Sequence, residues 1–163
     1  MGTIKVLGID PGLADTGIGL LRGRGDVIAA YSFGCIRTDK NDPLAGRLDY
    51  IFSRLVSLLE AEHPDLVVVE DVFSLPAYPA SGITLGQVTG IILLAAFRSG
   101  VPVRRVSVRE AKQVMTGSGN AGKQQLAAAV RSLLQHDEPI RPDHASDALA
   151  LAITGLFRYD RIS

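Results

Sequence analysis

The order of patterns along the chain predicts an α/β fold in which a mixed five-stranded sheet carries helices on both faces. Three strand-like segments come first and are separated by short glycine-containing turns, as in an antiparallel meander. Helical and strand-like segments then alternate, which is typical of βα units with parallel strands. The resulting order is βββαβαβααα, and 163 residues without a repeat or linker fit a single domain over residues 1–163.

The five strands are predicted from short apolar runs that are bounded by turn residues. They are expected at residues 4–10, 16–22, 27–38, 66–72 and 101–106. The fourth run, LVVVEDV, is the clearest, because a β-branched run of this length is typical of a central parallel strand. Pro11-Gly12 indicates a turn after the first strand, and the two prolines of residues 74–81 indicate a loop.

The five helices are predicted from apolar residues spaced three or four apart. They are expected at residues 43–63, 84–98, 109–115, 123–134 and 143–159. Gly86 and Gly90 would let the second helix pack closely against a neighbour. We expect that helix to belong to the core.

Composition excludes several classes of protein. Apolar residues make up 47% of the chain, enough for a core, and the longest apolar run spans residues 91–97, far short of the roughly 20 residues that cross a bilayer. Met1 leads directly into a strand-like segment without a signal sequence. The single cysteine, Cys35, suits a reducing compartment. We therefore expect a soluble, cytoplasmic protein with no membrane partner.

The charge is unevenly distributed, although the net charge is zero. Residues 97–131 hold seven basic side chains and one acid, Glu110, and therefore carry +6 against −6 elsewhere. Such a segment fits a solvated face and fits equally an enzyme that holds phosphates near a carboxylate metal site.

Two carboxylates stand at the ends of predicted strands. Asp10 ends the first strand, and Glu70 follows three consecutive valines in the fourth. Open α/β sheets bind ligands at the carboxyl ends of their strands, and a carboxylate among apolar residues is costly unless a cation neutralises it. The pair suggests a shared cation, while the alternative is that each caps a loop or pairs with an arginine.

The last predicted helix offers further ligands. His144 and Asp147 are three residues apart and Asp143 and Asp147 are four apart, so each pair can share a helix face. Asp143 fits an N-cap favoured by the helix dipole, whereas Asp147 lies a full turn inside. Together with Asp10 and Glu70, this oxygen-rich set suits Mg²⁺ or Mn²⁺ rather than zinc. Two such ions about 3.5–4 Å apart can promote phosphodiester cleavage.

Six segments resemble the Holliday-junction resolvase family RuvC and cover nearly the whole chain in the family's order. They are GIDPG (8–12), GCIRT (34–38), VVVEDVF (67–73), LGQVTG (85–90), the stretch from REAKQ to GKQQ (109–125) and DHASDALALAIT (143–154). The resemblance implies a ribonuclease-H-like fold and a homodimer paired through the second helix. It implies symmetric, Mg²⁺- or Mn²⁺-dependent nicking of four-way DNA junctions in recombination and repair, with RuvA and RuvB as partners.

The resemblance also implies the site residues. The metal-binding acids fall on Asp10, Glu70 and Asp147, and the fourth position falls on His144, where many members have aspartate and some have histidine. His144 could be a direct ligand, a general base or a group that orients a ligand. Asp143 is the competing candidate, but the family's spacing of three residues favours His144.

Four more residues match DNA-contacting positions of the family: Phe73, Arg109, Lys112 and Lys123. The family's phenylalanine stacks on a base near the junction centre, an interaction worth about 1–3 kcal/mol, and its basic residues lie near the scissile phosphate. Without the resemblance, Phe73 would be read as a core aromatic and the lysines as solvated.

The segment GSGNAGKQ (117–124) has the glycine and lysine spacing of a Walker A loop. Gln124 replaces the hydroxyl that would bind magnesium, and a helix rather than a strand is predicted before it. We therefore expect a flexible loop that approaches a DNA phosphate. His63 and His136 lie beside turns and are expected to be exposed without partners.

Two other functions remain compatible with the sequence. The histidine at position 144 would suit a junction-binding module without catalysis. GIDPG also resembles the phosphate loop of sugar-kinase and actin-like ATPases, but that architecture normally needs more than twice this length.

Overall fold

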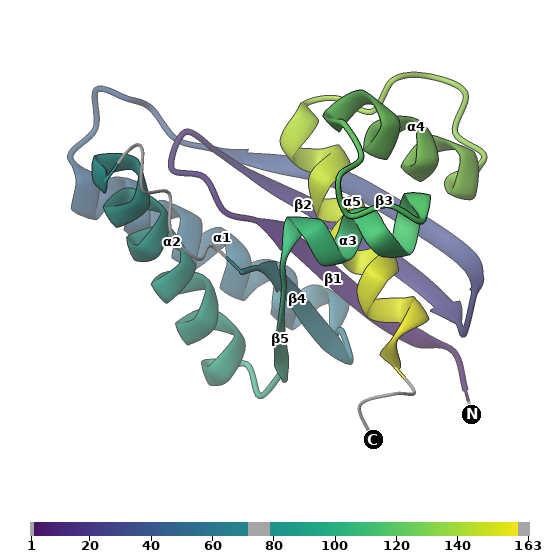
Figure 1. The fold of residues 1–163 in the computed structure, drawn as a ribbon. Coiled ribbons are helices and arrows are strands. Elements are labelled where there is room, and N and C mark those ends of the chain that lie inside the picture. Colours follow the sequence, from purple (N-terminus) through teal and green to yellow (C-terminus); the bar gives the residue numbers. More distant parts are fainter. Residues whose placement is uncertain (1, 72–78, 160–163) are drawn as a thin grey trace.

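The computed structural model describes residues 2–71 and 79–159, and its elements follow the predicted order. The strands are β1 (Ile4–Asp10), β2 (Asp15–Arg24), β3 (Val27–Arg37), β4 (Leu66–Glu70) and β5 (Val103–Val106). They form one sheet in the order β3-β2-β1-β4-β5, in which β1, β2 and β3 are antiparallel and β1, β4 and β5 are parallel (Figure 1). The predicted mixed five-stranded sheet is confirmed.

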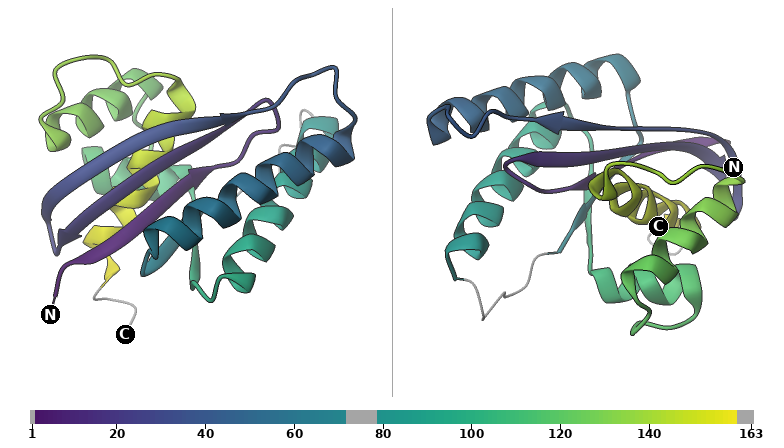
Figure 2. Two further views of the ribbon diagram at one scale, coloured as in Figure 1. Left: turned by 180° about the vertical axis from the view of Figure 1, so that it is seen from behind. Right: turned by 90° about the horizontal axis from the view of Figure 1, so that it is seen from above.

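The helices cover both faces of the sheet, as predicted (Figure 2). The helices are α1 (Leu44–Glu62), α2 (Pro79–Arg98), α3 (Val108–Thr116), α4 (Lys123–Leu134) and α5 (Asp143–Phe157). Helices α1 and α2 pack against each other on one face, and α5 crosses β1 and β2 on the other. Helices α3 and α4 contact α5 and each other, so they form an outer layer on that side.

Alternation along the strands divides the core in two. In β1 and β4, odd-numbered residues such as Leu7 and Val67 pack with α1 and α2. Even-numbered residues of the same two strands, such as Val6, pack with α5. Because successive strand residues point to opposite faces, Asp10 and Glu70 are directed to the α5 side.

Helix α5 lies directly on the backbone of β1 and β2, because these strands have glycine where the helix crosses them. A Cβ atom at Gly17 would lie 2.0 Å from the carbonyl oxygen of His144, and one at Gly8 would lie 2.0 Å from that of Ala148. Gly8 is also paired across the strands with Gly19, which meets the same helix. Glycine at these positions therefore sets how closely α5 approaches the sheet.

Several boundaries differ from those predicted. Residues 79–81 were expected in a loop but begin α2, because proline is well suited to the first turn of a helix. Strand β4 ends at residue 70 instead of 72, and β5 begins at residue 103 instead of 101. The last helix ends at residue 157 instead of 159. The remaining ends agree to within two residues.

The expectation that His136 is exposed and without a partner is wrong. Its Nδ1 lies 2.7 Å from the Tyr31 hydroxyl, and its ring packs edge-on against Tyr31 and Phe33. These contacts tie the connection after α4 to the edge strand β3. His63 is exposed, as expected.

Helix α2 has one buried and one exposed apolar face. Val88 and Ile92 are buried in the core, whereas Ile83, Leu94 and Phe97 are 66%, 48% and 82% exposed. The segment Ala80–Arg98 has a mean hydropathy of 1.7, so its length and composition alone would suffice to cross a membrane. A core helix of a soluble protein can meet the same criterion. The longest apolar run does not reveal this length, because glycine, threonine and glutamine interrupt the apolar residues of α2.

Candidate active site

The turn after β1 holds Asp10 at the carboxyl edge of the sheet. The hydroxyl of Thr16, which is fully buried, donates to the carbonyl oxygen of Gly12 at 2.6 Å. The hydroxyl of Thr38, beyond the end of β3, donates to the carbonyl oxygen of Leu13 at 2.6 Å. The turn is therefore fixed on both sides, and Asp10 is only 5% exposed.

Three elements bring their polar side chains to this edge. Strands β1 and β4 are parallel with Ile9 opposite Val69, so Asp10 and Glu70 follow in register at adjacent strand ends. His144, in the first turn of α5, places its Nδ1 2.7 Å from Oδ2 of Asp10. In this arrangement the imidazole donates to the carboxylate.

The carboxylates of this cluster interact strongly. Burial raises the pKa of Glu70 from 4.5 to about 8, with further contributions from a hydrogen bond to Asp10 and from the charges of Asp10 and Asp147. Burial also raises the pKa of Asp147, with the Asp10 charge adding to the effect and Lys123 opposing it. Carboxylates that raise one another's pKa favour a bound cation, because a cation stabilises their ionised forms.

His144 can also place positive charge next to these carboxylates. Its hydrogen bond to Asp10 raises the pKa of the imidazole, and burial opposes this shift. A protonated imidazole offsets one carboxylate charge, but it has no lone pair left for a metal ion. Protons and divalent cations therefore compete for the same cluster.

The donor set fits a divalent cation, although the ligands are not yet arranged around one point. Within residues 2–71 and 79–159, no three His, Cys, Asp or Glu side chains stand where they could hold one ion together. Three carboxylates and one imidazole are nevertheless the donors that suit Mg²⁺ or Mn²⁺. At least some of these side chains would have to move for three of them to reach one ion.

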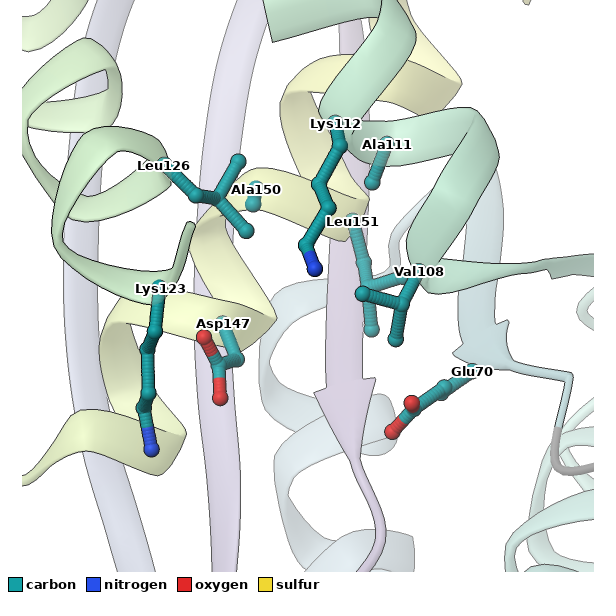
Figure 3. Close-up of a pocket in the computed structure, with 9 residues that line it drawn as sticks. All are labelled: Glu70, Val108, Ala111, Lys112, Lys123, Leu126, Asp147, Ala150 and Leu151. Carbon is teal, nitrogen blue, oxygen red and sulfur yellow. The ribbon is translucent and has the colours of Figure 1, made fainter. Parts of the chain in front are cut away.

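A pocket of about 190 Å³ adjoins the carboxylates and is walled by β4, α3, α4 and α5. Figure 3 shows the Lys112 side chain entering the pocket from α3, with its ammonium group directed towards the gap between Asp147 and Glu70. The Lys123 side chain runs beside Asp147 from the start of α4. The pocket thus combines two carboxylates and two cations over an apolar floor.

Other predicted site residues are placed differently. Arg109 does not line this pocket: its Nη1 lies 3.5 Å from Oδ1 of Asn120, in the connection between α3 and α4. Asp143 is the first residue of α5 rather than its N-cap, and it lies 3.4 Å from Lys123 with its side chain 69% exposed. Of the two candidates for the fourth position, His144 is the one that contacts Asp10. Phe73 lies outside the described residues.

The basic residues of segment 97–131 do not form a single face. Arg104 and Arg105 pair with carboxylates at 3.4 and 3.8 Å, and Arg98 lies over an aromatic ring of α1. Lys112 and Lys123 line the active-site pocket. The segment's charge is therefore shared between structural pairs and the site. As predicted, a helix and not a strand precedes residues 117–124.

The glycines that position His144 and Asp147 were not among the site residues predicted from the sequence. Gly17 and Gly8 allow the first turns of α5 to reach the strand ends. A detectable signal was present: Gly17 and Gly19 have the same parity in β2, and the helix that covers them is rich in alanine.

The chain is similar to known proteins over nearly its whole length. The family model described as "Crossover junction endodeoxyribonuclease RuvC" matches residues 6–155. Curated relatives of that name from Heliobacterium modesticaldum and Salinispora arenicola are each 40% identical to this chain. The alignments cover 91% of this chain and 91% of the former protein, and 95% of this chain and 89% of the latter.

Solved structures show the same similarity. The structure of T. thermophilus RuvC in complex with Holliday junction substrate has a TM-score of 0.88 and 33% identity, and the match covers 98% of this chain and 96% of that one. The yeast mitochondrial Holliday junction resolvase Ydc2 has a TM-score of 0.62 at 13% identity and supports the ribonuclease-H-like fold alone. The chain belongs to the RuvC family of crossover junction endodeoxyribonucleases, which are nucleases that depend on divalent metal.

Proposed function

We propose that this protein cuts four-way DNA junctions by metal-dependent hydrolysis of two phosphodiester bonds, in recombination and DNA repair. The observation that carries the proposal is the convergence of Asp10, Glu70 and His144, with Asp147 one turn further along α5, at one edge of the sheet. It occurs in a chain that matches, over nearly its full length, a RuvC that was solved with a Holliday junction.

Asp10, Glu70 and Asp147 would hold Mg²⁺, two ions per site with Mn²⁺ as a substitute, and His144 would complete the site. Bound divalent ions supply Lewis-acid stabilisation of the developing negative charge on phosphate and lower the pKa of water. The raised pKa of Glu70 and of Asp147 supports this role, because nearby positive charge favours the charged form of both carboxylates.

Lys112 would bind a non-bridging oxygen of the scissile phosphate, since it lines the same pocket as Glu70 and Asp147 and its ammonium group is directed towards the gap between them. A fixed cation there stabilises the additional negative charge of the transition state. Lys123 would bind the same or the next phosphate. Arg109, on the outer side of α3, would contact DNA further from the cut, and Phe73 would stack on a base.

The hydrogen bond between His144 and Asp10 supports a positioning role for the imidazole before metal enters. It holds Asp10 in one orientation and offsets its charge. A metal ion can bind the imidazole of His144 only after its second proton has left, so metal binding should strengthen as the pH rises. Loss of the same proton would free the imidazole to act as a ligand or as a base.

The exposed face of α2 supports a homodimer. Ile83, Leu94 and Phe97 are exposed along one stripe, and a Cβ atom at Gly86 or Gly90 would meet nothing within 4 Å in the described structure. Small residues beside large apolar ones allow two helices to approach closely. A two-fold dimer would present two active sites to a junction that has the same symmetry.

The cellular setting follows from family membership. We infer a cytoplasmic enzyme that acts with the RuvA and RuvB branch-migration proteins. Recruitment by these partners would supply junctions at the stage when two strands can be nicked symmetrically.

The direct test is cleavage of a synthetic four-way junction in Mg²⁺ by the wild-type chain, Asp10→Asn and the surface control Asp26→Asn. We expect symmetric nicks from the wild type and the control, and a loss of at least about a hundredfold for Asp10→Asn, since removing one charged group from a preorganised site typically costs that much. Equal cutting by all three proteins would overturn the assignment. Tight binding by the wild type without nicking in Mg²⁺ or Mn²⁺ would identify a junction-binding module instead.

A further inference from the structure

A larger cavity opens directly beside the active-site pocket. It has a volume of about 670 Å³ and lies between α4, the connection that follows α4, and the first turns of α5. Lys123 and Asp147 line both cavities, so the two adjoin each other. We call it the α4–α5 groove and define it by Lys123, Ala127, Arg131, Ile140, Arg141 and Ser146.

The groove is lined by more basic than acidic side chains. Lys123, Arg131 and Arg141 face Asp143 and Asp147, and Asp147 belongs to the proposed metal site. The pair between Lys123 and Asp143 is weak, because both side chains are 69% exposed and solvent screens them. With metal bound, the groove would be distinctly positive.

Each basic residue has a different role in the wall. The guanidinium of Arg131 donates to the carbonyl oxygens of His136 and Asp137, so it fixes the connection after α4 while it keeps its charge at the groove. Arg141 is exposed in the same connection and can reach a ligand. Arg131 thus holds the wall of the groove in place, and Arg141 is available to contact a ligand.

Two further donors face the same space. Helix α4 begins after Gly122 and has no acid in its first turn, so its first amides and the positive end of its dipole are available to an anion. Ser146 lines the groove with a hydroxyl although the residue is only 6% exposed. Hydroxyl and amide donors beside cations are the groups that bind phosphate oxygens.

The dimensions suit a nucleic-acid strand. Lys123 and Arg131 are eight residues apart on α4, which corresponds to about 12 Å along the helix. That is the axial length of roughly three to four nucleotides of one strand. In the part of the chain that the structure describes, the lining has no aromatic side chain on which a base could stack.

We propose that the α4–α5 groove binds the backbone phosphates of the DNA strand that is being cut, on one side of the scissile phosphate. This proposal rests on the proposed function and adds a binding site to it. The contacts are with phosphate and carry no base recognition, so they hold the strand in register across the carboxylates whatever its sequence.

The test is binding of a four-way junction in EDTA, measured as Kd against salt concentration for the wild type and Arg141→Gln. Loss of one phosphate contact should reduce the slope of log Kd against log salt by about 0.9 and weaken binding roughly three- to tenfold at 0.1 M salt. The matched control is Arg24→Gln, at the opposite end of the sheet, which should behave as the wild type.

Two more variants test the sign of the effect. Asp143→Asn removes the groove's exposed acid, so it should tighten binding and steepen the salt dependence. Arg141→Lys keeps the charge and should retain the wild-type slope, which separates loss of charge from local damage to the connection.

The outcomes separate this proposal from the proposed function. If the wild type binds and cuts the junction while Arg141→Gln shows the wild-type Kd and salt slope, the groove proposal is wrong and the function stands. If the wild type does not bind the junction, both are wrong.

Discussion

Helices α5 and α2 lie on opposite faces of the sheet and are both strongly apolar, yet they are covered very differently. Eleven residues of α5 are buried, from Ala145 to Leu156, whereas α2 leaves large side chains such as Phe97 in solvent. The positions of glycine account for the contrast. The glycines of β1 and β2 beneath α5, and Gly155 within α5, lie against close neighbours, while the glycines of α2 face open space.

This contrast shows that apolar composition alone does not tell whether the rest of the same chain buries a helix on all of its apolar faces. Helix α5 is pressed onto β1 and β2, and this contact delivers His144 to Asp10. Helix α2 is buried along one apolar stripe, and its second apolar stripe is exposed within the described chain. The first helix serves the site, and the second is suited to a partner.

The largest effect is expected from filling the space under α5. In Gly17→Ala the new Cβ would lie 2.0 Å from the carbonyl oxygen of His144, so backbone would have to move. We expect a loss of about 3 kcal/mol in the free energy of unfolding, measured by urea denaturation, because overpacking against backbone cannot be relieved by a rotamer change. Junction cutting should fall as well, since the first turn of α5 is displaced.

The matched control is Gly34→Ala in β3, where a Cβ atom meets nothing within 4 Å. It should change stability by no more than about 0.5 kcal/mol. If Gly17→Ala is as stable and as active as Gly34→Ala, the close contact of α5 with the strands does not position the site.

The next effect concerns the exposed stripe of α2. Phe97→Glu places a charge in the centre of the proposed subunit contact, and it should weaken dimerisation at least about tenfold, because burying an unpaired charge is costly. Sedimentation equilibrium would measure the change. Val27→Glu, at the turn between β2 and β3 and 64% exposed, is the control. A wild-type chain that is monomeric at all accessible concentrations would contradict the role given to α2.

The smallest effect concerns pH. Burial and neighbouring carboxylates raise the pKa of Glu70 from 4.5 to about 8. Below about pH 4.5 the carboxyl is protonated whether the chain is folded or unfolded. As the pH rises towards 8 only the unfolded chain ionises freely, so the folded state loses stability.

The variant Glu70→Gln should not show this loss of folding stability at high pH, because its amide does not ionise. Without divalent metal we expect the variant to be more stable than the wild type at pH 9 by roughly 1 to 2 kcal/mol, or about 3–6 °C in Tm. The advantage should disappear near pH 4. Calorimetry at both pH values in EDTA measures the difference in stability between the variant and the wild type. If that difference does not shift in favour of Glu70→Gln between pH 4 and pH 9, the pKa of Glu70 is not raised in the folded protein.

The sequence was sufficient for the order of elements and for the acids at the strand ends, because both follow from periodicity. Asp10 and Glu70 end apolar strands, which the sequence shows, whereas the register that brings them to one face is known only from the pairing of β1 with β4. The depth of α5 could not be predicted, since it depends on which helix crosses the glycines of β1 and β2. The partners of His136 depend likewise on contacts between residues about a hundred positions apart.

The choice between Asp143 and His144 shows the same limit. Both lie in the first turn of α5, and helix periodicity allows either to accompany Asp147. The structure places the His144 imidazole against Asp10 and pairs Asp143 with Lys123, because α5 meets β2 at residue 144.

The most direct measurement is anomalous diffraction from crystals soaked in Mn²⁺, for the wild type and for Asp10→Asn. We expect manganese peaks in the wild type within about 2.3 Å of carboxylate oxygens of Asp10, Glu70 and Asp147, near the 2.0–2.1 Å of Mg²⁺, and their loss in the variant. Peaks that avoid these residues in the wild type, at concentrations that support cutting, would contradict the metal site.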